Sequence, residues 1–408
     1  MKRSRRTAAI FGVVLLGAAP STWPMYQYFP NHNAVFAGTH AYRWHFDAGG
    51  KINGGLAVVG DTLYAETFAR QLLAIDRRTG RVRWRTHLPN IAMTTPIVAD
   101  GLVIVGTGKD NTLLQTRTRL VWGIPGGDEI IAFDADTGRV RWRYHTVGED
   151  MPSPAFVTAG GRDLIIFANG DGHIRALDVR TGRLVFSRYV GGVSTMASAA
   201  VADGVVYVLL GFAAGMHLPD HVYAVRASDG HIVWSAPYGN ADDSPTVGGV
   251  DVYVQDSQYV KGPPAVGAIN DVYAISRDRG LLVWARNAGA GYFTNVGTNE
   301  QAIAAMLDRD TLFQSLPAAR KFAAYEAGQG RPVWVVPTMT AAKMSAVALD
   351  GRVYIGDTAG ILYTFDEGSG RVLSRRRFPK PFTCSSPVIV GKTLYVADWN
   401  DVYALPLR

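Results

Sequence analysis

The 408-residue sequence contains a single cysteine, Cys384, and only 18% of its residues are charged. One cysteine excludes an internal disulfide, so the folded chain depends on packing for its stability. Hydrophobic residues make up 48% of the chain, which supplies a sizeable core and excludes a disordered composition. With 45 Gly and 20 Pro, the sequence suits many short strands joined by turns.

The motifs of several enzyme classes are also absent. The sequence has no Gly-x-Ser-x-Gly, no phosphate-binding loop and no Cys-x-x-Cys, and its nine His residues show no metal-ligand spacing. Beyond the N-terminus the one basic run is Arg375–Arg377, which we interpret as a solvated strand end. We therefore do not expect nucleic acid binding.

The first 19 residues are typical of an export signal or an N-terminal anchor. Basic residues at 2–6 precede the apolar stretch Ala8–Ala19, which is too short for the roughly 20 residues of a comfortable membrane span. Four of the seven net positive charges belong to this segment, leaving about +3 for the rest. We expect cleavage and a periplasmic or secreted protein. An uncleaved anchor is the alternative, because Pro20 is a poor residue to follow a cleavage point.

A repeated motif dominates the remainder. Leu73–Asp76 leads into Thr79–Trp84, and Ile131–Asp134 leads into Thr137–Trp142 in the same way. The pattern recurs, with substitutions, around Gly182, Gly230, Gly280, Gly330 and Gly370. Alternating residues before the Asp predict a half-buried strand, and the polar pair with Gly predicts a tight reversal into the next strand. Each motif is therefore a β-hairpin.

A second hairpin precedes each motif, as at Thr95–Val105 and Ser386–Val396. Eight such first hairpins occur along the chain, each predicting with its motif a four-stranded antiparallel blade. The chain ends on a third strand, Val402–Leu407, and begins with an isolated fourth strand, Tyr42–Phe46. We therefore predict an all-β, eight-bladed β-propeller over residues 40–408, closed by pairing of the N- and C-terminal strands, after an extended lead-in at 20–39.

The repeated Ala-x-Asp-x-x-Thr-Gly-x-x-x-Trp resembles the pyrroloquinoline quinone (PQQ) repeat family from about residue 40 to the end. Two branches are relevant: quinoprotein alcohol dehydrogenases, which use PQQ and calcium, and BamB, a non-catalytic outer-membrane assembly factor. Trp23–Tyr26 and Asn31–Asn33 also resemble the lead-in of the dehydrogenases.

The chain departs from both branches. The dehydrogenases carry a disulfide of adjacent cysteines, which one Cys cannot form, and their calcium-binding glutamate has no clear match near Gly106–Asp110. Their catalytic aspartate follows a blade Trp by eight residues, as Asp242 follows Trp234, but Asp150 follows Trp142 by the same interval. BamB is normally a lipoprotein, and this chain lacks the lipid-bearing cysteine.

Topology locates a site at one end of the central channel. The links between blades and the loops between second and third strands share one face of the disc, here called the link face. Aligning the links predicts a ring of residues at the channel mouth: Asn53, Met93, Met151, Met196, Asp242, Asn299, Lys343 and Cys384. Glu149, Asp150, Asp243, Glu300 and Ser385 stand beside it, and blade two adds a long loop, about Lys109–Asp128, containing Trp122.

Each group of mouth residues has a functional and a structural interpretation. Asp242 and Asp243 are candidate catalytic residues, and Glu149, Asp150 and Asp242 candidate metal ligands, although acidic residues also cap turns in propeller links. Trp122, Asn53, Asn299 and Lys343 are candidate cofactor contacts. The three Met residues and Cys384 suit a soft metal or an apolar plug. Lys343 facing Asp242 is either an anion clamp or a neutralising pair.

Three functions remain open at this point. The first is a ligand-binding or protein-scaffolding module of the cell envelope, since fold alone does not fix function. The second is a compact PQQ-dependent dehydrogenase, with PQQ and Ca²⁺ at the mouth, Asp242 as base and Trp122 as a stacking lid. The third is a cofactor-free hydrolase that uses an acidic mouth residue. We expect a monomer whose partner is a small molecule or an envelope protein, with membrane contact only through the N-terminal segment.

Overall fold

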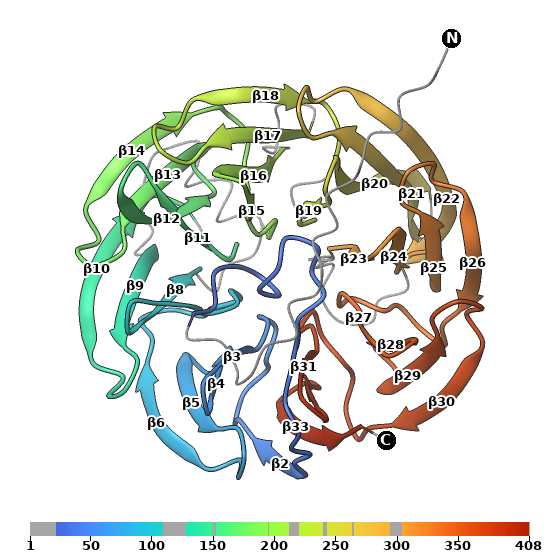
Figure 1. Ribbon diagram of the computed structural model, residues 1–408, viewed down its shortest axis with the longest axis horizontal. Helices are drawn as coiled ribbons and strands as arrows, with labels where there is room; N and C mark the ends of the chain where they lie inside the picture. The colour runs from blue at the N-terminus through green and yellow to red at the C-terminus, as the bar shows by residue number, and fades with distance from the viewer. Residues whose placement is uncertain are drawn as a thin grey trace.

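The computed structural model presents the chain as a ring of β-sheets around a central channel (Figure 1). No helix in the described part of the chain is long and apolar enough to cross a membrane. The expected signal, residues 1–19, and the Trp122 loop lie outside this part. The structure describes residues 22–108, 128–148, 150, 152–194, 196–211, 220–239, 243–262, 265–293 and 304–407.

The described strands form eight sheets, which confirms the predicted eight-bladed all-β propeller. Blade one contains β3 (Ala57–Val59), β4 (Thr62–Thr67), β5 (Gln71–Asp76) and β6 (Val82–His87). Blade two contains β7 (Ile97–Ala99), β8 (Leu102–Thr107), β9 (Asp128–Asp134) and β10 (Val140–Thr146). Blade three contains β11 (Ala155–Ala159), β12 (Arg162–Ala168), β13 (His173–Asp178) and β14 (Leu184–Tyr189). Blade four contains β15 (Ala200–Ala202), β16 (Val205–Leu210), β17 (His221–Arg226) and β18 (Ile232–Ala236).

The second half of the ring repeats this order from the channel outward. Blade five contains β19 (Thr246–Val247), β20 (Asp251–Gly262), β21 (Ala265–Ser276) and β22 (Leu282–Phe293). Blade six contains β23 (Met306–Asp308), β24 (Thr311–Leu316), β25 (Lys321–Glu326) and β26 (Pro332–Pro337). Blade seven contains β27 (Val347–Leu349), β28 (Arg352–Gly356), β29 (Ile361–Asp366) and β30 (Val372–Arg377). Blade eight contains β31 (Val388–Val390), β32 (Thr393–Ala397), β33 (Asp401–Pro406) and β2 (Trp44–Asp47), with β1 (Val35–Phe36) parallel to β31.

The polar residues of the motif build the turn between the third and fourth strands. In blade one, Asp76 Oδ1 accepts hydrogen bonds from the backbone N–H of Arg78 at 3.0 Å and of Thr79 at 3.1 Å. Gly80 then takes a φ of +73°, a conformation that costs glycine little. Asp134 with Thr137, Asp178 with Thr181 and Asp366 with Ser369 repeat the arrangement.

The same glycine receives the aromatic ring of the preceding blade. A Cβ on Gly138 would lie 2.6 Å from the indole of Trp84, and the Trp84 Nε1–H donates to the carbonyl of Ala135 at 2.9 Å. Gly182 is packed against Trp142 in the same way. The ring and the glycine are paired likewise in Trp44–Gly80, Phe186–Gly230, Trp234–Gly280, Trp284–Gly330 and Trp334–Gly370. The large residue and the small one therefore lock each blade onto the next.

The seam between blades seven and eight lacks this pair for a topological reason. The chain ends after β33, so blade eight has no turn from a third to a fourth strand, and Ser374 stands where other blades have an aromatic ring. Phe378 packs there instead, with its ring centroid 4.8 Å from that of Tyr403 and 5.1 Å from that of Phe382.

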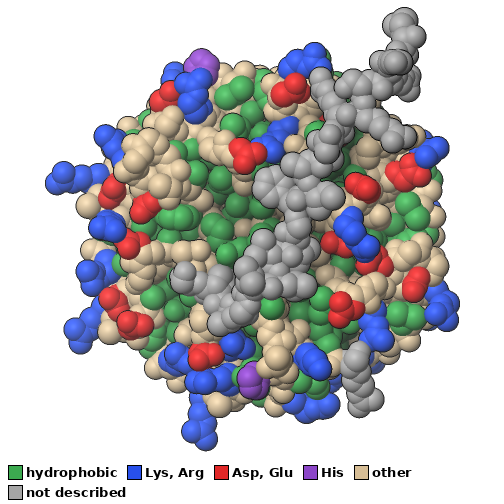
Figure 2. All heavy atoms as spheres, viewed as in Figure 1, with side chains coloured by type: hydrophobic (Ala, Val, Ile, Leu, Met, Phe, Trp, Pro, Cys, Tyr) green, Lys and Arg blue, Asp and Glu red, His purple; other side chains and the backbone are tan. Residues whose placement is uncertain are grey.

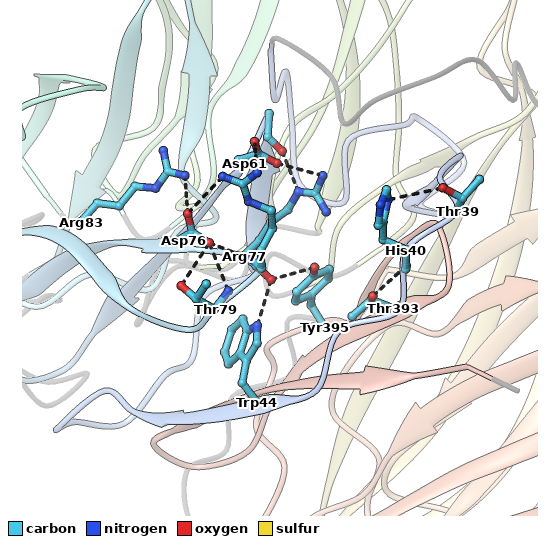
Figure 3. A network of polar contacts seen from close by, with 12 residues as sticks. Thr39, His40, Trp44, Asp61, Asp76, Arg77, Thr79, Arg83, Thr393 and Tyr395 are labelled. Carbon is cyan, nitrogen blue, oxygen red and sulfur yellow. Dashed lines mark hydrogen bonds and ion pairs between the residues drawn. The ribbon is translucent and has the colours of Figure 1, made fainter.

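Closure of the ring by the two ends of the chain is confirmed. β2 pairs with β33 in antiparallel register from Trp44↔Ala404 to Asp47↔Asp401. Figure 3 shows the resulting seam with blade one, where Trp44 Nε1 and the Tyr395 hydroxyl both donate to the Arg77 carbonyl, at 2.9 and 3.0 Å. The N-terminal strand thus joins blade eight to blade one.

The lead-in runs along the inside of the channel, and Figure 1 shows it in dark blue across the centre of the ring. Its backbone, or in one case the Asn33 side chain, bonds to the innermost strands of six blades in turn. The contacts are Trp23 with Val98, Pro24 with Phe156, Pro30 with Val247, Asn31 with Leu307, Asn33 with Ala348 and Ala34 with Ile389. Because Trp23, His32 and Ala34 are fully buried, this segment is part of the core.

We predict that Gly138→Ala destabilises the fold by about 2–4 kcal/mol. The positive φ of +69° accounts for about 1 kcal/mol and the clash with Trp84 for the remainder. The control is Gly101→Ala, whose φ is +73° but whose added Cβ meets nothing within 4 Å. Urea unfolding of both variants measures the difference. Equal losses would contradict the role of the indole contact.

Candidate functional site at the link face

A belt of hydroxyl groups surrounds the channel where the links enter the innermost strands. The backbone N–H of Gly55 donates to Thr95 Oγ1 at 3.0 Å, and that of Thr95 donates to Ser153 Oγ at 2.7 Å. The same bond joins Ser153 to Ser198, Ser198 to Ser244 and Ser345 to Ser386. The recurrent Ser or Thr of the first hairpins therefore links the neighbouring blades at these five seams.

Tyr26 brings the lead-in into this belt. Its hydroxyl contacts Ser345 Oγ at 3.3 Å and also Ser386 Oγ. The pKa of Tyr26 is raised to about 12, mainly by burial; the hydrogen bonds with Ser345 and Ser386 lower it, and the charges of Cys384 and Asp243 add a smaller increase. Tyr26 is thus a neutral hydroxyl group close to two of the predicted mouth residues, Cys384 and Asp243.

The predicted mouth residues that the structure describes are mostly buried. Asn53, Met196, Asp243, Lys343 and Cys384 are all buried, whereas Met93 is half-buried. Asp243 is held by a hydrogen bond from the Gln255 backbone N–H to its Oδ2 at 2.7 Å. Met151, Asp242, Asn299, Glu149 and Trp122 lie outside the described residues, so their predicted roles stay predictions.

Asp150 is a buried carboxyl group beside blade two. It accepts a hydrogen bond from the Thr146 hydroxyl, while its Oδ1 has no hydrogen-bond partner among the described residues. Burial raises the pKa of Asp150 well above its usual range; the charges of Asp128 and Asp171 raise it further, and Arg175 opposes them. Asp150 therefore favours its neutral form.

Glu66 is a second buried carboxyl group, which the sequence reasoning missed. It lies near the link-face end of β4, where Thr94 Oγ1 donates to Glu66 Oε1 at 2.5 Å. Burial raises the pKa of Glu66 well above its ordinary value. Its Oε2 has no hydrogen-bond partner in the described part of the chain. The sequence does carry a signal that could have identified Glu66: it is the one charged residue in the strand Thr62–Thr67.

His32 is the other ionisable group that the sequence reasoning missed. Its Nδ1 lies 3.2 Å from the Tyr26 carbonyl and its Nε2 lies 3.0 Å from the Pro245 carbonyl. A neutral imidazole can donate to only one of them. Burial nevertheless lowers the pKa of His32 to about 4, outweighing both backbone carbonyls, which raise it.

The described residues alone do not form a metal site. Across the described ranges, no group of three His, Cys, Asp or Glu side chains could hold a metal ion. Cys384 is buried and is the single cysteine of the sequence, so the chain forms no internal disulfide. Two of the three predicted metal ligands, Glu149 and Asp242, lie outside the described residues, so metal binding stays a prediction.

Known proteins share this architecture and its repeat. A family model described as "Outer membrane protein assembly factor BamB" matches residues 33–203, 171–314 and 268–408, which together span the propeller. The chain belongs to this PQQ-like propeller family. It is 25% identical over 375 residues to "Tetrathionate hydrolase" of Acidithiobacillus ferrooxidans, covering 87% of this chain and 72% of the relative.

One further relative and one solved structure are also similar to this chain. "Outer membrane protein assembly factor BamB" of Bordetella pertussis is 24% identical over 349 residues, which cover 84% of this chain and 80% of the relative. The solved quinohemoprotein alcohol dehydrogenase from Comamonas testosteroni superimposes with a TM-score of 0.69 at 12% identity, covering 95% of this chain and 80% of that one. This last likeness shows the fold alone.

We predict opposite pH effects of Asp150 and His32 on stability. The pKa of Asp150 is higher in the folded protein than in the unfolded chain. Its contribution to the free energy of unfolding is therefore complete below the pKa of the unfolded chain and is lost as the pH rises through the pKa of the folded protein. Because the folded pKa of His32 is lowered from 6.5 to about 4, its contribution is lost as the pH falls through that window, at about 1.4 kcal/mol per pH unit.

Urea unfolding from pH 4 to pH 7 tests both effects. Relative to the unmodified protein, Asp150→Asn should gain stability as the pH rises, and His32→Gln should gain stability as the pH falls. Parallel pH profiles for the three proteins would show that neither group changes its proton affinity on folding.

Proposed function

We propose that this chain is an exported propeller of the cell envelope that binds a small molecule at its link face and hydrolyses it without a redox cofactor. The observation that carries this proposal is the set of buried carboxyl groups at the link face, Glu66, Asp150 and Asp243. Buried acids without a full set of hydrogen bonds are costly to stability, and such groups are concentrated at functional sites.

The chemistry assigned to the site is general acid–base catalysis of attack by water. Asp243, which the Gln255 N–H holds in place, accepts a proton from water as its oxygen bonds to the substrate. The bond to the leaving group breaks and the electron pair departs with that group. Neutral carboxyl groups such as those of Glu66 and Asp150 are suited to donating protons to it.

The proposed substrate class is a sulfur oxyanion. The similarity to a tetrathionate hydrolase extends over 87% of this chain. Lys343, buried at the mouth, supplies a positive charge for a dianion. The single cysteine, which cannot form the disulfide of adjacent cysteines, argues against the dehydrogenase alternative.

A scaffold for envelope proteins is the second candidate. The lead-in fills part of the channel with fully buried side chains such as Trp23 and His32. A partly filled channel is compatible with a scaffold as well as with an enzyme. The match to a family model described as an outer-membrane assembly factor also favours this candidate. Localisation in the envelope, expected from residues 1–19, is common to both functions.

We predict that the purified protein consumes tetrathionate and releases acid, and that Asp243→Asn lowers kcat at least about a hundredfold. The control is Asp229→Asn, which changes an exposed carboxylate that pairs with Arg226 in the turn between β17 and β18. Tetrathionate loss by ion chromatography and proton release in weak buffer measure the rates. Titration with PQQ and Ca²⁺ is run in parallel.

The outcomes separate the candidates. Stoichiometric PQQ binding with alcohol oxidation would replace hydrolysis by the dehydrogenase function. No turnover and no PQQ binding would leave the scaffold. Equal activity of Asp243→Asn and Asp229→Asn would remove Asp243 from the chemistry while keeping the hydrolase.

A further inference from the structure

The lead-in is fastened to the blades through polar side chains. Asn33 is the clearest case, because its Nδ2 donates to the Ala348 carbonyl at 3.2 Å and its Oδ1 accepts from the Ala348 N–H at 2.9 Å. The Asn31 side chain donates to the Leu307 carbonyl at 2.9 Å. Polar groups inside a protein are normally satisfied in this way. The two carboxamides therefore hold the lead-in against blades six and seven.

Gln27 is the exception on the same segment. It is 2% exposed, and neither its Nε2 nor its Oε1 has a hydrogen-bond partner among the described residues. Trp23 Nε1 also lacks one, but the Trp23 ring packs against Tyr28 and Phe36, with centroids 5.3 and 5.6 Å away, and this packing accounts for its burial. Burying a carboxamide without hydrogen bonds is unfavourable. Gln27 therefore lowers stability and gains no polar contact in return.

The backbone at Gln27 adds a second cost. The Tyr28 N–H donates to the Met25 carbonyl at 2.9 Å, which closes a turn with Gln27 in its third position at a φ of +52°. Glycine or asparagine normally occupies such a position. Tyr28 follows with a φ of +65°, and the Phe29 N–H donates across it to the Gln27 carbonyl at 2.7 Å. A three-residue turn of this hand is rare and strained. The chain thus holds a glutamine where a glycine would fit with less strain.

This turn lies in the channel, close to the candidate site. The charge of Asp243 acts on the hydroxyl of Tyr26, the residue directly before Gln27. The Tyr26 carbonyl, whose carbon is bonded to the Gln27 nitrogen, lies 3.2 Å from His32 Nδ1. On the other side of the same ring, His32 Nε2 lies 3.0 Å from the carbonyl of Pro245. A single imidazole therefore separates the peptide of Gln27 from the segment that contains Asp243.

The surroundings make an unpaired amide costly. Figure 2 shows hydrophobic side chains gathered around the middle of one face of the disc, whereas Lys and Arg side chains project mainly from its rim. Met25, two residues before Gln27, packs into the apolar cluster of blades three to five. Hydrogen bonds are strong in such surroundings, and polar atoms left without them are correspondingly unfavourable. A polar molecule in the channel would therefore bind favourably to both ends of the Gln27 carboxamide.

We propose that Gln27 is a substrate-binding residue of the link-face site, an assignment that rests on the hydrolase function proposed above. Its Nε2 donates to an oxygen of the sulfur oxyanion, and its Oε1 accepts a hydrogen bond from the attacking water. The amide takes up no proton, so the proton of that water goes to Asp243, and the electron pair of the broken bond leaves with the departing group. Gln27 thus holds the water beside the oxyanion. The lead-in is then an inner wall of the site as well as part of the core.

Gln27→Met tests the proposal, because it keeps the length of the side chain and removes both polar atoms. We expect two effects of opposite sign. The kcat/KM for tetrathionate should fall at least about tenfold, since a hydrogen bond to a charged ligand is lost. The midpoint of urea unfolding should rise, since no buried unpaired amide remains. Gln27→Gly also relieves the positive φ and should change both quantities in the same directions. A residue that only supports the fold would lower both.

Asn33→Leu is the matched control, because it removes a carboxamide of the same lead-in that is bonded at both ends. It should lower the urea midpoint and change KM by less than about twofold. Calorimetric titration with thiosulfate, an oxyanion with the same kind of sulfur–oxygen end, adds a readout without turnover. Its affinity should also fall at least about tenfold in Gln27→Met.

The outcomes distinguish this assignment from the hydrolase itself. Turnover with an unchanged kcat/KM in both Gln27 variants overturns the assignment and keeps the hydrolase, since Gln27 then holds only a water molecule. A lower urea midpoint for both Gln27 variants likewise overturns it. Thiosulfate binding that Gln27→Met weakens, without tetrathionate turnover, supports the binding role and removes the hydrolase. An unmodified protein that neither consumes tetrathionate nor binds thiosulfate overturns both proposals.

Discussion

The packing of an aromatic ring on a glycine is the interaction on which the whole ring depends. Trp84 on Gly138 combines three requirements in one contact: a positive φ, the absence of a Cβ and a carbonyl within reach of the indole N–H. Each contact fixes the angle and the distance between two blades. Repeating this contact around the disc sets the number of blades, because the rotations between neighbouring blades must add up to a closed ring. The channel and the ring of link residues follow from that closure.

Much of this architecture could be predicted from the sequence, since its determinants are local and repeated. The Asp-x-x-Thr-Gly turns, the alternation of the strands and the isolated fourth strand at Trp44 are each visible within a few residues. Even the departure at Ser374 is explained by the missing turn of blade eight. Where the residues repeat, the structure repeats.

The candidate site was harder to predict from the sequence, because its contacts join distant positions and do not repeat. Link alignment predicted a shared position at the channel mouth for Asn53, Asp243, Lys343 and Cys384, and the structure shows that all four are buried. It could not place Tyr26 against Ser345 and Ser386, which lie 319 and 360 residues further along the chain. It also passed over Glu66, because a lone acid in a strand carries no periodic signal. Asp242, Asn299, Glu149 and Trp122 stay predictions.

The path of the lead-in has a consequence for how the molecule is made. Its residues bond to the innermost strands of blades that are synthesised over the entire length of the chain, the last at Ile389. The earliest described part of the polypeptide therefore has no complete binding surface until nearly all of the chain is present. β2 likewise cannot pair until β33 has been synthesised. The lead-in and the closing strand pair therefore reach their final contacts in the same late event of folding.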